Sequence, residues 1–295
     1  MQQIQNKRII SEPFEELGVK DNFYQSTAFF PTPFALITTV NEDGVTSIGP
    51  HSLVFPLDII ESHSMLLVSR AGSNTAMNLH NGSKCALNYI EFDREWLKSV
   101  VALGYPGQTP DAKMQDIPFE LINTPDQRFA FDPLFPLVMQ DAFQVFECEV
   151  DDSFEYRPKR AAQPQVVGNF FALRIENILM KASWKQKLDQ REEFPDMPIS
   201  YGFRGGKDFW FVRHGKPFGI PIPRGKGQSS SRIYYMANKL DPEVRFTEEA
   251  CRKLAEIPPA FIDVALEGII KEAKEQSLSM VGGEFLAQLE TQRGI

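Results

Sequence analysis

Short apolar runs separated by turn residues fill residues 29 to 183, and this pattern restricts the fold more than any other feature of the sequence. The clearest run, residues 34–40, is rich in β-branched and aromatic side chains, and the turn sequence Asn41-Glu-Asp-Gly44 follows it. Further runs cover residues 65–69, 84–90, 142–150 and 169–178. About five or six short strands of this kind predict a mainly β protein, built as an antiparallel closed or split barrel.

The remaining segments differ in character. Residues 75–82 suit a short helix entered through a Ser or Asn cap, and the Pro- and Gly-rich stretch 94–135 predicts a helix and long loops inserted between strands. Thr247 is a candidate N-cap for a helix that ends at Pro258-Pro259, where a second helix can begin. We therefore expect an N-terminal arm (1–22), a barrel domain (23–185), a connector with one possible hairpin near residues 208–216 (186–244) and a small helical module (245–295).

Composition excludes several classes of protein. The chain has a formal net charge of −8, which disfavours binding to nucleic acids or anionic membranes, and it contains no apolar stretch of the length a membrane span needs. The N-terminal residues lack the apolar core of a signal peptide, so we expect a cytoplasmic protein with no nucleic-acid or membrane partner. Neither the three cysteines nor the four histidines have metal-ligand spacing, so we expect reduced, buried cysteines and no catalytic metal: Cys85, Cys148, Cys251, His51, His63, His80 and His214.

Two neighbouring segments, residues 44–55 and 69–75, combine small residues, hydroxyl groups and one guanidinium. Small and hydroxylated residues in residues 44–55 let a backbone approach the flavin ring closely, and the segment 69–75 offers hydroxyls, a guanidinium and the N–H groups of a helix start for a phosphate. The expected flavin contacts are Ser47, Pro50, His51, Ser52 and Leu53 for the ring, and Ser69, Arg70, Ser73, Asn74 and Thr75 for the ribityl phosphate. Taken alone, Ser-Asn-Thr before a short apolar helix is equally a plain capping sequence.

A set of residues recurs along the chain in a fixed order: Pro33, Asp43-Gly44, Pro50-His-Ser52, Arg70, Thr75, Asn78, Gly82 and Asn88. This order resembles that of the flavin-reductase-like family of FMN-binding split barrels, and the strands 142–150 and 167–175 resemble the later strands of that family. The resemblance covers about residues 23–185. It implies a Greek-key-like antiparallel split barrel with short helices, and an FMN at the interface of a homodimer. Ser47 stands where the family commonly has Asn, so its contact with the flavin is the least supported.

A second resemblance lies at the C-terminus. Residues 245–258 and the helix after them are similar to the small helical module that ends the subunits of light-independent protochlorophyllide reductase. The resemblance implies a docking or packing element without catalytic residues.

These features lead to one main functional hypothesis and two alternatives. The main one is an FMN-dependent oxidoreductase that takes electrons from NADH or NADPH and passes them to a flavin, another small-molecule acceptor or a redox partner protein. Without a GxGxxG fingerprint, the nicotinamide would bind directly over the flavin. His51 is a possible proton donor, or a histidine at a strand end with no role in the reaction. The alternatives are an FMN-binding electron carrier or sensor without turnover, and a pyridoxamine-phosphate-oxidase-like or heme-binding split barrel.

Overall fold

The computed structural model describes residues 14–105, 110–154, 168–190, 193–204, 206–220, 229–259 and 261–293. The chain divides into two compact units, Met1–Pro217 (unit 1) and Phe218–Ile295 (unit 2). Within the described residues, no helix is both long and apolar enough to cross a membrane.

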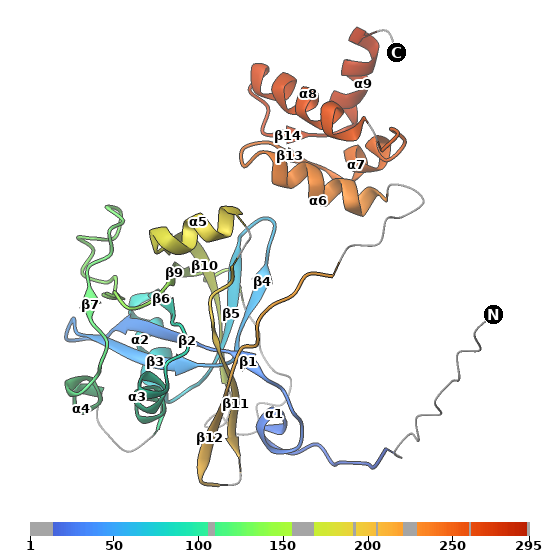
Figure 1. Cartoon of the computed structure of the whole chain (residues 1–295). Helices are drawn as coiled ribbons and strands as arrows, with labels where there is room; N and C mark the ends of the chain where they lie inside the picture. The colour runs from blue at the N-terminus through green and yellow to red at the C-terminus, as the bar shows by residue number, and fades with distance from the viewer. Residues whose placement is uncertain are drawn as a thin grey trace. The chain divides into compact units, whose positions relative to one another are not determined.

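Unit 1 is built on an antiparallel sheet of seven strands in the order β3-β2-β6-β9-β10-β5-β4 (Figure 1). The sheet curls into a half-barrel, and β3 and β4 form its two edges. The strands are β2 (Ala35–Val40), β3 (Thr46–His51), β4 (Val54–Asp58), β5 (Ser64–Arg70), β6 (Lys84–Tyr89), β9 (Gln144–Val150) and β10 (Gly168–Met180). The predicted class, a mainly β antiparallel split barrel with short helices and a helical C-terminal region, is confirmed.

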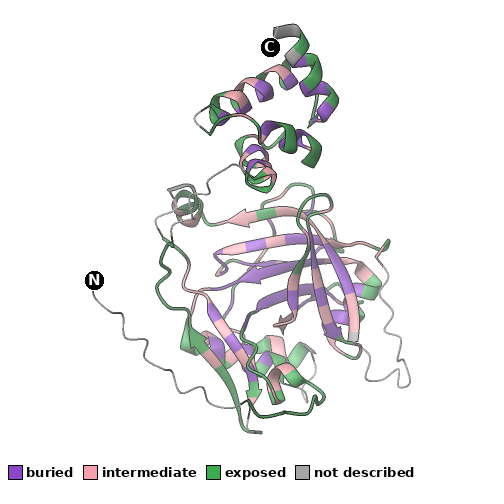
Figure 2. Cartoon of the chain, turned by 90° about the vertical axis from the view of Figure 1, so that its right-hand side faces the viewer, coloured by how far each residue is buried: buried purple, intermediate pink, exposed green. Residues whose placement is uncertain are grey.

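Apolar side chains pack on both faces of this sheet, because successive residues of a strand point to opposite sides. On one face Ile37, Leu67 and Leu87 pack with Ala76 and Leu79 of α2 (Asn74–Gly82). On the other face, Leu36 and Ile48 pack with residues of α3 (Arg94–Gly104) and of the segment that follows it. Buried residues therefore run along most of the strands of the sheet (Figure 2).

The long insertion after β6 is fixed to the sheet by buried polar groups. It contains α3, α4 (Pro110–Gln115) and the short strands β7 (Leu121–Ile122) and β8 (Val138–Met139). Asn88 is completely buried; its amide donates to the carbonyl of Leu36 at 2.8 Å and accepts from the N–H of Met139 at 2.9 Å. Asn88 thus holds β8 against the sheet, which gives this residue of the family pattern a structural role.

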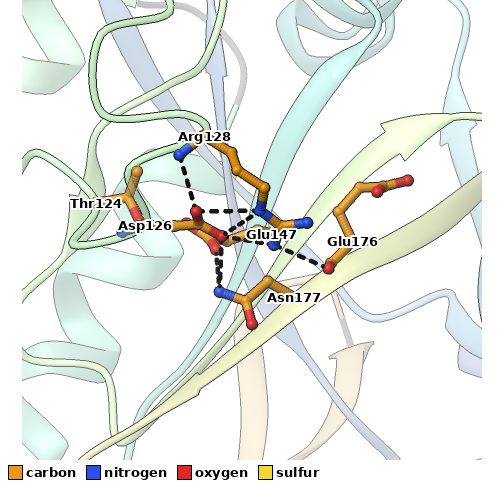
Figure 3. A network of polar contacts seen from close by, with 6 residues as sticks. All are labelled: Thr124, Asp126, Arg128, Glu147, Glu176 and Asn177. Atoms are coloured by element: carbon orange, nitrogen blue, oxygen red, sulfur yellow. Dashed lines mark hydrogen bonds and ion pairs between the residues drawn. The ribbon is translucent and has the colours of Figure 1, made fainter.

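A second buried group, the carboxylate of Glu147 on β9, lies in a polar network (Figure 3). It accepts hydrogen bonds from the hydroxyl of Thr124 and, at 2.8 Å, from the amide of Asn177 on β10. The amide of Asn177 also reaches Asp126 at 3.0 Å, and Asp126 pairs with Arg128 at 2.6 Å. Glu147 faces Asn177 at a β-bulge between β9 and β10, so the network ties the insertion to the irregular part of the sheet.

A small second sheet, in the order β1-β11-β12, completes unit 1. It comprises β1 (Thr32–Pro33), β11 (Pro198–Arg204) and β12 (Asp208–Arg213), and Phe211 packs edge-on against Phe34 with ring centroids 5.7 Å apart. The flanking helices are α1 (Phe23–Ser26) and α5 (Ala182–Gln190). The range 186–244, expected as a connector, is thus divided: its hairpin belongs to unit 1, and its last part forms a helix of unit 2.

Unit 2 is helical and has its own hydrophobic core. Its helices are α6 (Ser230–Leu240), α7 (Glu248–Leu254), α8 (Ile262–Glu275) and α9 (Gly283–Arg293), with a parallel pair of short strands, β13 (Arg245–Phe246) and β14 (Met280–Val281). Thr247 caps α7 as predicted, because its hydroxyl accepts the N–H of Ala250 at 3.2 Å. Phe261, just before α8, is 64% exposed, whereas the helix itself packs through five buried residues: Ile262, Leu266, Ile269, Ile270 and Ala273.

Candidate functional site

The candidate site lies at the N-terminus of α2. Ser73 is extended (φ −79°, ψ 145°) and caps the helix, since its hydroxyl accepts the N–H of Ala76 at 3.1 Å. The hydroxyls of Ser69 and Ser73 are 2.6 Å apart. In the described part of the chain, the N–H groups of Asn74 and Thr75 have no acceptor, as is usual for the first residues of a helix. The capping interpretation is therefore correct, and it leaves two N–H donors free.

The end of β3 lies directly against this helix start. The Nε2 atom of His51 is 3.0 Å from the hydroxyl oxygen of Thr75. Gly49 lies on the same face of β3 as His51. A Cβ at this position would overlap the Thr75 hydroxyl, so only glycine allows β3 to come this close to the start of α2. A backbone that closely approaches a helix start is the arrangement expected for the flavin bed.

Ser47, on the same side of β3, is used for packing. The amide of Asn78 donates to the hydroxyl of Ser47 at 3.1 Å and to that of Thr39 at 2.9 Å, and all three residues are buried. These bonds fix α2 to β2 and β3. They occupy the Ser47 hydroxyl.

Strand alternation separates Pro50 from the other expected ring contacts. Pro50 lies on the opposite face of β3 from His51, where its Cγ is 3.0 Å from the position of a Cβ on Gly104 at the end of α3. Ser52 and Leu53 are half-buried between β3 and β4, and the carbonyl of Leu53 bonds to the N–H of Val68 at 2.9 Å. The structure thus brings together His51, Ser69, Arg70, Ser73, Asn74 and Thr75, with Ser52 and Leu53 adjacent, and places the side chain of Pro50 apart from them.

Arg70, at the end of β5, supplies the positive charge of the site. Its side chain is exposed, and in the described residues it makes no ion pair with a carboxylate. Its charge acts on three other groups: the ring of His51, the hydroxyl of Tyr24 on α1 and the ammonium of Lys113 on α4. Sequence reasoning missed Tyr24 and Lys113, because neither carries a local motif and both are more than 40 residues from Arg70.

The electrostatics of the site keep His51 neutral. Burial of the ring and the nearby charge of Arg70 lower the pKa of His51 to about 4. At neutral pH the ring is therefore the neutral imidazole, which keeps one N–H for hydrogen bonding but is not the acidic imidazolium form that donates a proton readily. Burial raises the pKa of Tyr24, against the smaller opposing effect of Arg70, so its phenol remains a hydrogen-bond donor. No cluster of three or more metal-ligating side chains occurs in the described ranges.

Solved structures provide the comparison for this barrel. A flavoredoxin from Methanosarcina acetivorans superimposes with a TM-score of 0.51 at 14% identity, and the match covers 72% of this chain and 98% of that one. This is the split-barrel fold. An FMN-binding protein from Thermus thermophilus with bound 1-cyclohex-2-enone matches with a TM-score of 0.50 at 14% identity, over 72% of this chain and all of that one.

A third split barrel, nitrilotriacetate monooxygenase component B from Bacillus cereus, matches with a TM-score of 0.50 at 11% identity over 70% of this chain and 100% of that one. No protein-family model and no curated protein matches the sequence. The predicted resemblance to the flavin-reductase-like split barrels is therefore confirmed at the level of the fold. The resemblance of unit 2 to the protochlorophyllide reductase module stays a prediction.

Proposed function

We propose that unit 1 binds FMN and is an NAD(P)H-dependent oxidoreductase of the flavin reductase type. The observation that carries the proposal is the exposed guanidinium of Arg70, without a carboxylate partner in the described residues, beside the two free N–H groups at the start of α2. In a chain of net charge −8, such a site favours an anion that the rest of the molecule repels.

The side chains present fit the phosphate of FMN. Arg70 would form charge-assisted hydrogen bonds to it, and the N–H groups of Asn74 and Thr75 would add two more donors. Ser69 and Ser73 bring hydroxyl groups to the same point. The fold supports the proposal, since two of the matched split barrels are a flavoredoxin and an FMN-binding protein.

The residues of the site hold and orient the cofactor. When bound, FMN would accept a hydride from NADH or NADPH and pass electrons to a small-molecule acceptor or a redox partner protein. Gly49 leaves room for close approach to β3, and neutral His51 offers a hydrogen bond without adding charge. As the resemblance implies, we expect two copies to assemble as a homodimer, which sedimentation of the purified protein would test.

Flavin uptake tests the proposal. Purified protein should bind FMN, and anaerobic NADH or NADPH should bleach the bound flavin. A bound flavin that stays oxidised would instead identify an electron carrier or sensor. Protein that binds no FMN would refute the proposal.

A matched pair of variants locates the site. Arg70→Ala should weaken FMN binding by about 1 to 3 kcal/mol, through loss of a charge-assisted bond. Arg252→Ala, which removes an exposed arginine from unit 2, should leave FMN affinity unchanged. Equal affinities in the two variants would remove Arg70 from the site.

A further inference from the structure

Strand β12 is an exposed edge of the small sheet of unit 1. It pairs with β11 on one side, and among the described residues no strand pairs with its other side. Its interior, Phe209-Trp-Phe-Val212, is entirely apolar, and Phe209, Trp210 and Val212 are 39%, 55% and 43% exposed. The hairpin of β11 and β12 extends beyond the seven-stranded sheet (Figure 1). Its outer edge therefore offers unpaired N–H and C=O groups between apolar side chains.

The other edges of the seven-stranded and three-stranded sheets are protected. Each contains a proline, which has no N–H to donate to a further strand: Pro50 in β3, Pro56 in β4 and Pro33 in β1. Strand β12 contains no proline, and its charged residues, Asp208 and Arg213, stand only at its two ends. Native proteins rarely leave such an edge open, because it would pair with other chains. We therefore expect a partner to cover β12.

The sequence of β12 can pair with a second copy of itself. Two antiparallel copies related by a two-fold axis must set residues of the same face opposite each other, because successive side chains of a strand alternate between its faces. A pairing centred on Phe211 meets this condition. It sets Trp210 opposite the partner's Val212, an aromatic and a β-branched side chain, and Asp208 opposite the partner's His214, which can donate a hydrogen bond to the carboxylate.

Charge distinguishes this register from the neighbouring one. A pairing centred on Trp210 would set Lys207 opposite the partner's Arg213, and like charges directly opposite each other are destabilising. In the register centred on Phe211, Arg213 lies opposite the partner's Phe209 instead. The side chain of Arg213 is 72% exposed, although it pairs with Asp196 of its own chain, so it can also contact an aromatic ring across the axis.

We propose that two copies of this chain associate through β12, in the antiparallel register centred on Phe211, and so join their three-stranded sheets into one. Six residues a side is far below the roughly 20 to 30 residues a side of a standard interface. The association is therefore weak, with a dissociation constant in the micromolar range. The inference does not depend on flavin binding.

Sedimentation velocity over a concentration series tests the surface, with Val212→Lys and a matched control, Ile59→Lys. Val212→Lys sets a charge opposite the partner's Trp210, whereas Ile59 is an exposed apolar residue of unit 1 outside β12. We expect wild type and Ile59→Lys to shift from monomer to dimer as the concentration rises, and the dissociation constant of Val212→Lys to be at least about tenfold higher. Wild type that stays monomeric, or Val212→Lys that dimerises as strongly as wild type, would overturn the inference.

Disulfide cross-linking tests the register. The three natural cysteines are buried, so cysteines introduced on β12 should react first with a mild oxidant such as oxidised glutathione. Trp210→Cys and Val212→Cys, mixed in equal amounts, should form disulfide-linked dimers, because the two positions lie opposite each other. Each variant alone should stay monomeric on a non-reducing gel, since its cysteines would be diagonal neighbours across the axis. Dimers from Trp210→Cys alone, or none from the mixture, would refute the proposed register.

Discussion

His51 should make unit 1 sensitive to acid. In the unfolded chain its imidazole titrates near its ordinary pKa of 6.5, whereas in the folded protein the pKa is about 4. Between these values the unfolded state binds more protons than the folded state, so stability present above pH 6.5 is lost as the pH falls toward 4. The pKa difference of about 2.5 units corresponds to about 3.4 kcal/mol of unfolding free energy. Solvent screens part of this effect because His51 is only half-buried, so we expect a loss of about 2 kcal/mol.

Urea unfolding at about pH 7 and about pH 4 would measure this loss, with tryptophan fluorescence as the signal. The three tryptophans, Trp96, Trp184 and Trp210, all lie in unit 1, so the signal reports that unit alone. His51→Gln keeps a hydrogen-bonding side chain and does not titrate, so it should lose about 2 kcal/mol less than wild type. Arg70→Met should reduce the loss in part, because Arg70 is the smaller cause of the low pKa. Equal losses in wild type and His51→Gln would refute the reasoning.

The other expectations concern buried contacts of unit 1. Asn88→Ala should destabilise the unit by about 2 to 4 kcal/mol, measured by the same urea assay, because it leaves the N–H of Met139 unpaired. Burial raises the pKa of Glu147, so the wild-type protein loses stability as the pH rises through that pKa. Glu147→Gln does not titrate, so its free energy of unfolding should rise relative to that of wild type between about pH 4 and pH 8. A difference in stability between the two proteins that does not change with pH would contradict this. Gly49→Ala should cost about 1 to 3 kcal/mol, and less in a Thr75→Ala background, as a double-mutant cycle would measure.

Much of the fold follows from local patterns. The apolar run at residues 34–40 predicts β2, and the capping residues Ser73 and Thr247 predict the starts of α2 and α7. These elements can be predicted because strand alternation and helix capping depend on residues close together in the sequence. Helix α6 was missed within the expected connector, although Ser229 caps it and Ile233 and Ala237 are buried at helical spacing. This helical spacing directly follows a segment rich in proline and glycine, which favours a loop.

The candidate site was only partly predictable. The segment from Ser69 to Thr75 forms one turn and a helix start, so its groups are together by local geometry. Pro50 and His51 are expected ring contacts and neighbours in β3, yet their side chains face opposite sides of the sheet, as strand alternation predicts. The charge of Arg70 lowers the pKa of Lys113 in the insertion, and no local pattern encodes this approach of residues far apart in the sequence.

The buried pair of Glu147 and Asn177 has a consequence for how the barrel assembles. The observed register of β9 and β10 places Asn177 opposite Glu147, so that its amide donates to the carboxylate. A slip of one residue would bury the Glu147 side chain without this donor, at a cost of several kcal/mol. We infer that Glu147 destabilises misaligned pairings of β9 with β10 and so favours a single folded structure.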